Sequence, residues 1–393
     1  MNTKKYYLFC PGPVNISQNV KEAVRHEIGH REIEFSLLLA SINKKILKLY
    51  QIENTRLYHP IMITGSGTAA NESVLSSIVG DSNILILSNG EFGERLFEIS
   101  KLHNENSHIL KFDWTQKFDM KKIEKYVKDN KIKIIAMVHH ETSTGMLNPI
   151  EKVGSIAKKY ELTYIVDSVS SIGAEKIDIE KCNISFIVGT SGKAIGSLPG
   201  VGFIIGKKKE FKKLKDVKPK TMYLNLYKLF EYSINHLQTP NTPAVQLFFA
   251  LEQALDNILQ EGIEYRLKHI ALMTKTLRKG MQELGLSFVI DEKDMSCVLT
   301  TVKLPKYISF QTLKHNLRER NIIIYNGKGP LLNKAFQVGN IGAIDKNNVD
   351  FFLNELKEIL LQAKNENKNI RNMQKIRFIK NLSTAQSQTI GGL

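Results

Sequence analysis

The feature that most constrains the fold is an alternation of short apolar segments with amphipathic segments across residues 16–245. The apolar segments have the length of buried strands. We predict strands at 60–64, 83–87, 108–112, 132–138, 163–167, 184–189 and 201–206, with helices at about 68–79, 91–102, 119–129 and 150–160. Strands that alternate with helices build a mostly parallel sheet with helices on both faces. The sequence therefore predicts an α/β protein whose large domain contains a mostly parallel, seven-stranded sheet.

The remainder of the chain predicts a smaller unit. A cluster of breakers, Thr239-Pro240-Asn241-Thr242-Pro243, precedes a helical pattern over about 244–284 that is interrupted near Gly262. Strands are expected near 286–290, 297–303, 321–325 and 335–339, and helices near 309–320 and 345–363. We divide the chain into an N-terminal arm (1–15), a large domain (16–245), a small α+β domain with its linking helix (246–365) and a loosely ordered tail (366–393).

Composition limits the classes of protein to which the chain can belong. Its 393 residues suffice for two domains, and 42% hydrophobic and 24% charged residues are ordinary for a globular protein. No apolar run approaches the length of about 18 residues that a membrane span needs. The three cysteines, Cys10, Cys182 and Cys297, form neither a metal-binding pattern nor a disulfide framework. We expect a cytoplasmic enzyme with no metal site and no membrane partner.

The formal charge of +16 raises the question of a nucleic-acid partner. Lysines cluster over residues 207–220 and again over 364–380, without a series of interleaved aromatic residues that could serve as stacking platforms for bases. We therefore expect no nucleic-acid partner and interpret these lysines as solvated surface residues. Weak steering of anionic substrates is the alternative.

Three chemical groups lie near the ends of predicted strands. Gly65-Ser66-Gly67-Thr68 follows the first strand, Asp167 ends the strand at 163–167, and Lys193 follows the strand at 184–189. Ligands of such sheets bind at the carboxyl ends of the strands. Pyridoxal phosphate needs a lysine for its aldehyde, an acid for its ring nitrogen and a helix N-terminus for its phosphate. The sequence therefore predicts a site for this cofactor.

Each of these signals has an ordinary alternative. An acid at a strand end is most often a cap or a loop ion pair, and a lysine after a turn of small residues is usually a surface lysine. The glycine-rich turn also fits the dinucleotide motif G-x-G-x-x-G/A. That motif predicts an acid at the end of the next strand, where this chain has Ser88-Asn89.

Several longer motifs resemble the class V aminotransferases of fold type I, which depend on pyridoxal phosphate. The resemblance covers about residues 8–362 and is strongest to the branch of 2-aminoethylphosphonate–pyruvate transaminases and alanine–glyoxylate or serine–pyruvate aminotransferases. The motifs are Pro11-Gly12-Pro13, Gly65 to Glu72, Asn89 to Gly93, His140 to Pro149, Val166 to Ser171, Gly192-Lys193, Leu198 to Phe203 and Val338 to Gly342. The segment from His140 to Pro149 is the most specific to the phosphonate branch.

The resemblance implies a role for each matching residue. Lys193 would bond to the cofactor aldehyde and then move a proton, while Asp167 would pair with the ring nitrogen. Phe92 would stack on the ring, with an ordinary core phenylalanine as the alternative. Thr142 would contact the ring hydroxyl or line the pocket, or act only as a loop cap. The phosphate ligands would be Ser66, Gly67, Thr68, Thr190 and, from the neighbouring subunit of a homodimer, Thr239.

One position departs from the family pattern. Gln337 stands in Ala335-Phe336-Gln337-Val338-Gly339, where the family usually has an arginine that grips a substrate carboxylate. Only arginine offers that planar, charged fork. The segment Gly29-His30-Arg31 resembles an anion-binding segment of phosphoserine aminotransferases, so Arg31 and His30 are candidate replacements. An ion pair of Arg31 with Glu32 or Glu34 on a solvated turn is the equally weighted alternative.

These features predict an aminotransferase that moves an amino group from a small anionic donor to a 2-oxo acid such as pyruvate or glyoxylate. The donor is 2-aminoethylphosphonate or a small amino acid. Because Gln337 removes the usual carboxylate clamp, a lyase, decarboxylase or desulfurase that uses the same cofactor is the alternative.

Overall fold

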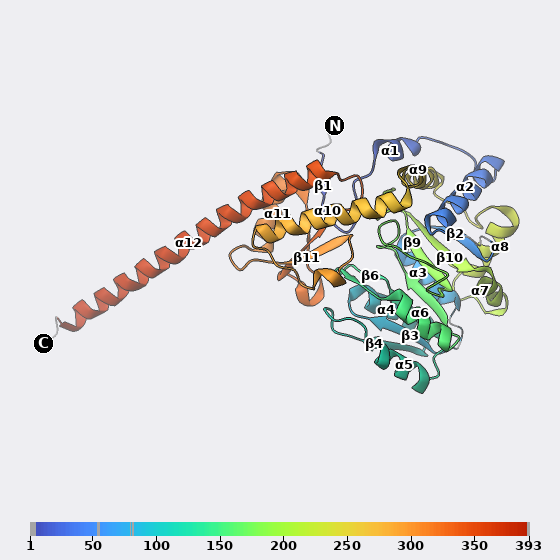
Figure 1. Ribbon diagram of the computed structural model, residues 1–393, viewed down its shortest axis with the longest axis horizontal. Helices are drawn as coiled ribbons and strands as arrows, with labels where there is room; N and C mark the ends of the chain where they lie inside the picture. The colour runs from blue at the N-terminus through green and yellow to red at the C-terminus, as the bar shows by residue number, and fades with distance from the viewer. Residues whose placement is uncertain (1–4, 53–55, 79, 81, 391–393) are drawn as a thin grey trace.

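The computed structural model describes residues 5–52, 56–78, 80 and 82–390, and its larger part is built on a seven-stranded sheet (Figure 1). Across the sheet the order is β2 (Tyr58–Thr64), β10 (Val201–Lys207), β9 (Phe186–Thr190), β8 (Thr163–Asp167), β5 (Ile134–Val138), β3 (Ile84–Ser88) and β4 (Ser107–Lys111). β10 is antiparallel to both of its neighbours, and the other pairs are parallel. The predicted mostly parallel sheet is confirmed, and each predicted strand coincides with one of these seven.

Helices cover both faces of this sheet because its strands bury side chains on both sides. In β5, Ile135 and Met137 join one hydrophobic cluster. Ile134 and Val138 point the other way and join a second cluster. The helices over the first face are α1 (Gln18–Ala23), α2 (Ile33–Leu49), α5 (Met120–Asp129), α6 (Ile150–Lys159) and α9 (Val245–Glu261). Over the second lie α3 (Gly67–Ile78), α4 (Glu91–His103), α7 (Lys208–Lys213) and α8 (Leu226–His236).

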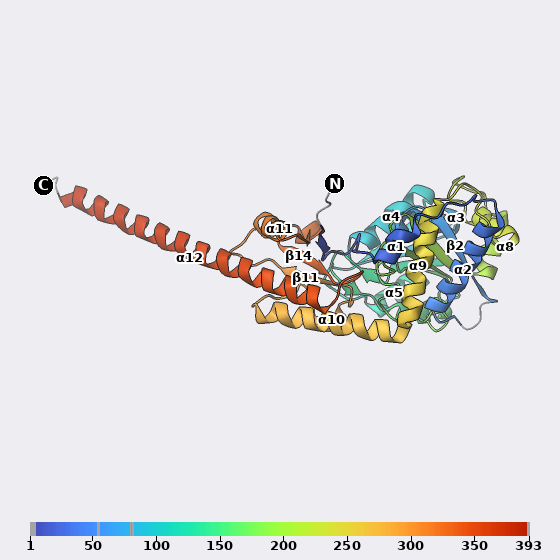
Figure 2. The same ribbon diagram turned by 90° about the horizontal axis from the view of Figure 1, so that it is seen from above.

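The long helical pattern after the breaker cluster forms two helices, as its interruption predicts. Gly262 has a φ of +86° and separates α9 from α10 (Ile263–Glu283). Residues with a side chain rarely adopt that backbone conformation, so glycine ends one helix and begins the next at low cost. α10 then runs along the smaller part of the molecule (Figure 2).

The smaller part contains a three-stranded antiparallel sheet in the order β11 (Leu299–Lys303), β14 (Ala335–Gly339), β13 (Tyr325–Asn326). Its core joins Leu277 of α10, Leu313 of α11 (Phe310–Glu319) and Phe352 of α12 (Lys346–Ile390). The strand expected at 286–290 is reduced to one bridge between Phe288 and Val302. The boundaries drawn at residues 15, 245 and 365 stay predictions.

The strand expected at 321–325 is split between two partners. β12 (Ile322–Ile323) pairs in parallel with β1 (Tyr7–Leu8), whereas β13 pairs with β14. Ile322 and Ile324 are both buried, so the chain bends between two small sheets without leaving the core. The N-terminal segment is thereby fixed against the small domain, and its next residues, Pro11 and Gly12, lead toward the large domain.

The final helix differs from its prediction. α12 was expected to end near residue 363, with a loosely ordered tail over 366–393, but it continues to Ile390. Figures 1 and 2 both show it running far beyond the body of the molecule. Extending a helix that is already packed costs less than nucleating a new one, so loss of an apolar face does not end it. Residues 391–393 lie outside the described part of the chain, in which no helix is both long and apolar enough to cross a membrane.

Candidate active site

The carboxyl end of β2 leads through a sharp turn into α3. Gly65 has a φ of +157°, and its N–H donates to the Gly200 carbonyl over 2.8 Å. Ser66 and Thr68 are exposed at the N-terminus of α3. Backbone N–H groups at a helix N-terminus attract anions, and hydroxyls add further donors. This turn can therefore hold a phosphate.

The same turn packs directly on the segment after β8. A Cβ at Gly67 would lie 2.5 Å from Cγ2 of Val169, so only glycine fits there. The Val169 N–H in turn donates to Asp167 Oδ1 over 2.8 Å. Val169 thus contacts the phosphate turn through its side chain and the Asp167 carboxylate through its N–H, and it links their positions.

Asp167 is a buried carboxylate at the end of β8. Its second oxygen accepts a hydrogen bond from Asn71 Nδ2 over 2.7 Å. Burial raises the pKa of Asp167, while these two hydrogen bonds and the charges of Arg95 and Lys193 oppose the rise. Among the described residues no salt bridge neutralises it. A protonated ring nitrogen is the kind of partner that this carboxylate lacks.

Lys193 lies just beyond β9, on the turn after Gly192. Its Nζ donates to the Pro11 carbonyl over 2.9 Å, so the N-terminal segment closes one side of the site. Burial lowers the pKa of this amine. The charges of Lys328 and Arg95 lower it further, whereas Cys10 and Asp167 act in the opposite direction. A lysine with a lowered pKa is neutral, and hence nucleophilic, closer to neutral pH.

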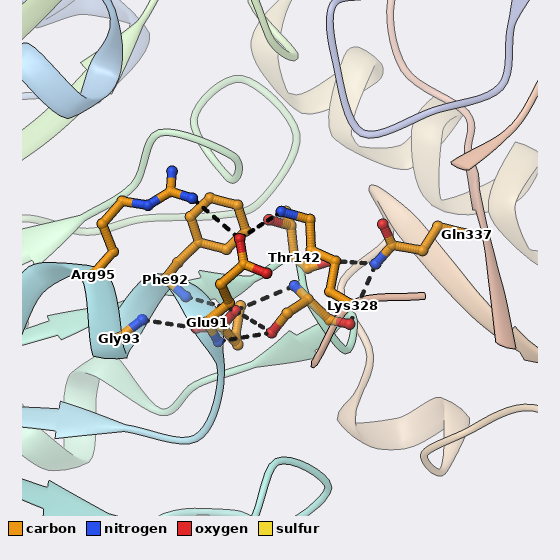
Figure 3. Close-up of polar contacts among 9 residues, drawn as sticks. Glu91, Phe92, Gly93, Arg95, Thr142, Lys328 and Gln337 are labelled. Atoms are coloured by element: carbon orange, nitrogen blue, oxygen red, sulfur yellow. Dashed lines mark hydrogen bonds and ion pairs between the residues drawn. The ribbon is translucent and has the colours of Figure 1, made fainter. Parts of the chain in front are cut away.

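Phe92, in the first turn of α4, has two cations over its ring, which lie close to each other. The guanidinium carbon of Arg95 is 4.7 Å from the ring centre and Nζ of Lys328 is 4.6 Å from it. Both cations also bind the same Glu91 oxygen, at 3.1 and 2.8 Å. Figure 3 shows the Glu91 carboxylate between them. The predicted ring-stacking residue thus contacts a charged cluster and also packs against the apolar core on the second face of the sheet, and its stacking on a cofactor ring stays a prediction.

A buried carboxylate fixes α4 next to this cluster. Glu141 belongs to a short hairpin formed by β6 (His140–Glu141) and β7 (Met146–Leu147). It accepts hydrogen bonds from the N–H groups of Phe92 at 3.3 Å and Gly93 at 3.0 Å, at the N-terminus of α4. A carboxylate at a helix N-terminus is stabilised by the helix dipole. Glu141 therefore sets the position of Phe92 relative to Thr142, the next residue in the chain.

Gln337 is fully buried on β14, facing the same hairpin. Its Nε2 donates to the carbonyl of Thr142 over 2.6 Å and to that of Ser143 over 3.3 Å. Its Oε1 is buried without a hydrogen-bond partner among the described residues. Thr142 is likewise buried and meets Gln337 through its backbone. Gln337 thus ties the small domain to the hairpin.

Arg31 contacts the turn that carries Thr239, and this turn lies beside the end of β2. Arg31 donates to the backbone carbonyls of Thr239 at 2.8 Å and Pro240 at 3.3 Å, and within the described part of the chain it makes no ion pair with Glu32 or Glu34. The Thr239 hydroxyl donates to the Asn241 carbonyl over 2.8 Å. No hydrogen bond or ion pair among the described residues joins this turn to Lys193. In place of the alternative ion pair with Glu32 or Glu34, Arg31 therefore binds backbone carbonyls.

The predicted phosphate ligand Thr190 has another partner. Its Oγ1 donates to the Val201 carbonyl over 3.1 Å, across the β9–β10 pair. The Thr190 hydroxyl proton is therefore engaged in a hydrogen bond within the sheet, and a contact between Thr190 and phosphate stays a prediction.

Sequence reasoning missed four residues that contribute to the site: Asn71, Glu91, Arg95 and Lys328. The spacing of Glu91 and Arg95 along α4 could have identified their ion pair. Asn71 lies one turn into α3 and carried no signal that it reaches Asp167. Lys328 comes from the small domain, and no local pattern indicates that it reaches Glu91.

The residues at the carboxyl ends of β2, β8 and β9 fit pyridoxal phosphate. The buried carboxylate of Asp167 lacks a cationic partner, the Lys193 amine has a lowered pKa, and the exposed N-terminus of α3 suits a phosphate. These are the residues that would hold the ring nitrogen, the aldehyde carbon and the phosphate.

Comparison with known proteins agrees with this chemistry. An uncharacterized aminotransferase of Methanocaldococcus jannaschii is 34% identical over 344 residues, which span 86% of this chain and 88% of that protein. A 2-aminoethylphosphonate–pyruvate transaminase of Phocaeicola vulgatus is 31% identical over 348 residues, 87% of this chain and 95% of that protein. The solved structure of an alanine–glyoxylate aminotransferase from Nostoc sp. superposes with a TM-score of 0.87 at 27% identity, covering 92% of this chain and 96% of that one.

The family itself follows from the extent of these matches. The model of class V aminotransferases matches residues 14–339, which is most of the chain and includes the three strand ends of the site. Proteins of this family with the same fold use pyridoxal phosphate, the group that the residues at the strand ends fit. The chain therefore belongs to the class V aminotransferases and is a pyridoxal-phosphate-dependent aminotransferase of fold type I.

Proposed function

We propose that this enzyme transfers the amino group of a small anionic amine to a 2-oxo acid such as pyruvate or glyoxylate. The donor is 2-aminoethylphosphonate or a small amino acid. The observation that carries the proposal is Lys193, a buried amine of lowered pKa that donates to the Pro11 carbonyl and interacts electrostatically with the buried Asp167 carboxylate and with two cations. The similarity to 2-aminoethylphosphonate–pyruvate transaminases supports the choice of donor.

Each residue has a defined task in this reaction. Bound pyridoxal phosphate supplies an electron sink for the carbon that carries the amino group. Asp167 would hold the proton on the ring nitrogen. Lys193 would hold the aldehyde end of the cofactor, and its neutral amine would move a proton between two carbons as a base. Phe92 would cover the ring, and the N-terminus of α3 would hold the phosphate.

A reaction without a 2-oxo acid acceptor is the less favoured alternative. A desulfurase needs a reactive thiolate. Cys297 is half-buried, and its thiol donates to the Ala174 carbonyl over 3.1 Å. Burial raises the pKa of this thiol, and the neighbouring Glu175 raises it further. Cys297 therefore stays protonated and does not suit that chemistry, and the relatives that match over most of the chain are named as aminotransferases.

The proposal includes a homodimer in which each site receives a threonine from the other subunit. Beside the Thr239 turn, Ile33 and Leu37 of α2 are 66% and 62% exposed. The Gln238 side chain donates a hydrogen bond to the Ser36 hydroxyl of α2, so α2 and the turn form one face. An exposed apolar face of this kind suits a self-complementary contact with a second copy. Thr239 of the partner subunit would then reach the phosphate.

The proposal also places the enzyme in the cytoplasm. Cys10, Cys182 and Cys297 are all free thiols. Free cysteines are typical of proteins in reducing compartments.

A donor screen tests the proposed reaction. The enzyme loaded with pyridoxal phosphate is mixed with 2-aminoethylphosphonate, alanine, serine or phosphoserine, and the visible spectrum is followed. Transamination converts the bound cofactor to its amine form, and pyruvate or glyoxylate reverses the change. Release of product with an unchanged cofactor spectrum would instead identify a lyase, and no response to any of the four donors would contradict the proposed donor class.

A further inference from the structure

We propose that Lys328 and Arg95 bind the anionic end of the substrate, a carboxylate or a phosphonate, in the role that an arginine at position 337 plays in related enzymes. This inference rests on the proposed function and names the residues that select its substrate. It replaces Gln337 as the candidate anion ligand.

The geometry of Gln337 removes it from that role. Its Nε2 is bound to two carbonyl oxygens of the hairpin, Thr142 and Ser143. These acceptors fix the orientation of the amide, because a flipped amide would place its own oxygen against two carbonyl oxygens. The atom that remains free is Oε1, which is a hydrogen-bond acceptor. An acceptor repels a carboxylate or a phosphonate, so the anion must bind elsewhere.

The cluster of Lys328, Arg95 and Glu91 carries a net positive charge. Both cations share a single carboxylate, Glu91, and bind the same oxygen of it. Two positive charges and one negative charge leave an excess of one positive charge. The side chains of Lys328 and Arg95 are 31% and 40% exposed, so a ligand can reach both. A charged group that is partly dehydrated and bears excess charge is a favourable partner for an anion.

This charge lies beside the reacting groups. Lys328 and Arg95 both lie over the Phe92 ring, and both contribute to lowering the pKa of Lys193 after the larger effect of burial. Arg95 also acts on Asp167. An anion bound here would be close to the Lys193 amine, as a small substrate requires.

The loop that carries Lys328 is built to hold it in place. A Cβ at Gly327 would lie 2.4 Å from the Leu331 carbonyl oxygen, and one at Gly329 would lie 2.4 Å from the Trp114 ring. Neither of the two glycines beside Lys328 therefore has room for a side chain. The contact with Trp114 anchors this small-domain loop on the large domain, so that Lys328 reaches across to Glu91 (Figure 3). Groups that are positioned before binding lose less entropy when the ligand arrives.

The test measures anion binding separately from catalysis. The proteins are the wild type, Lys328→Gln, Lys328→Arg, Arg95→Gln and Lys111→Gln, all loaded with pyridoxal phosphate. Lys111 of β4 is the matched control, because it makes an exposed ion pair with Glu94 of α4, the helix that also carries Arg95. Calorimetric titration with methylphosphonate and with acetate, neither of which can donate an amino group, gives the dissociation constants. The apparent substrate constant and turnover for 2-aminoethylphosphonate and alanine are measured in parallel.

We expect Lys328→Gln and Arg95→Gln to weaken anion binding roughly 10- to 100-fold, as the loss of one charged hydrogen bond does. Lys328→Arg and Lys111→Gln should keep the wild-type constants. Methylphosphonate binding that depends on Lys328 more than acetate binding does would identify a phosphonate substrate, and the reverse a carboxylate.

Equal binding by the wild type and both glutamine variants, or no anion binding by the wild type, would overturn the inference. A wild type that binds methylphosphonate through Lys328 yet accepts no amino donor would leave the inference standing and defeat the proposed function instead.

Discussion

Single residues set the charge on which the chemistry depends, and Asp167 is the first example. Replacing it by asparagine keeps the shape of the site but removes the negative charge that holds a proton on the ring nitrogen. We expect Asp167→Asn to retain cofactor that borohydride fixes to Lys193. Turnover should fall by roughly 100-fold or more, the scale of a positioned proton-transfer group. Peptide mapping and a turnover assay check both points, and unchanged turnover would show that another acid holds the proton.

The amine of Lys193 supplies a prediction with a definite sign. Its pKa is lowered by burial and, in addition, by the charge of Lys328. Removing that charge with Lys328→Gln should raise the pKa, so that more of the amine is protonated at a given pH. The rate at which the apo enzyme captures pyridoxal phosphate should therefore follow a pH profile moved to higher pH. Trapping with borohydride across a pH series measures it, with Lys111→Gln as the control, and a shift to lower pH would contradict the assignment.

At the scale of elements, one contact connects α3 to the turn after β8. Gly67→Ala would push a methyl group into Val169, which holds Asp167 through its N–H. Overpacking of this kind costs about 1–3 kcal/mol. We expect lower affinity for pyridoxal phosphate and a lower Tm. The double variant Gly67→Ala/Val169→Ala should recover most of the affinity, because the clash is gone. If the double variant is as weak as the single one, the defect lies in the backbone turn and not in this contact.

The same scale shows what a sequence predicts well. The central strands are uniformly buried apolar runs, as in β5, so their positions follow from local pattern alone. Lys193 and Asp167 stand at the ends of such strands and were predicted with them. Lys328 lies on a loop of the small domain, and it becomes a candidate site residue only because the fold brings it to Glu91 of α4. A contact between residues so far apart in the chain leaves no periodic trace.

The end of α12 is a feature that the local sequence pattern predicts incorrectly. Local pattern predicted that the helix stops where its buried face stops, yet a helix needs only continued backbone hydrogen bonds once it has begun. Of the side chains described, the last buried one in α12 is Ala363. The fold of the small domain therefore depends on the first part of the helix.

At the scale of the whole molecule, this difference predicts the effect of two truncations. Deleting residues 370–393 removes helix without removing a described core residue, so Tm and turnover should stay at wild-type values while the helical circular dichroism signal falls. Deleting from Leu356 onward also removes Ile359 and Leu360, which are buried in the small-domain core. Loss of several such side chains costs several kcal/mol, at about 2–5 kcal/mol for each truncated core residue. Equal losses of Tm in both truncations would show that the distal helix is packed in solution.

The quaternary proposal makes the last prediction. If each site combines Lys193 of one subunit with Thr239 of the partner subunit, Lys193→Ala and Thr239→Glu should each be inactive alone. The first lacks the amine, and the second places a negative charge against the phosphate. Co-expression of the two would produce mixed dimers in which one site has both native residues. Random pairing should then restore roughly a quarter of wild-type activity, as expected for a two-fold symmetric dimer.

The apolar face beside the Thr239 turn provides the companion measurement. Ile33→Glu/Leu37→Glu places two charges on that face and should give a monomer by light scattering, with lowered affinity for pyridoxal phosphate because the partner's threonine is absent. Leu102→Glu, at a position 79% exposed on α4, is the control and should leave the wild-type state unchanged. A wild type that is monomeric with cofactor bound, or mixed variants that stay inactive, would place the complete site within one chain. In that case the contacts of Arg31 with the Thr239 turn would serve only to hold the segment before α2 against that turn.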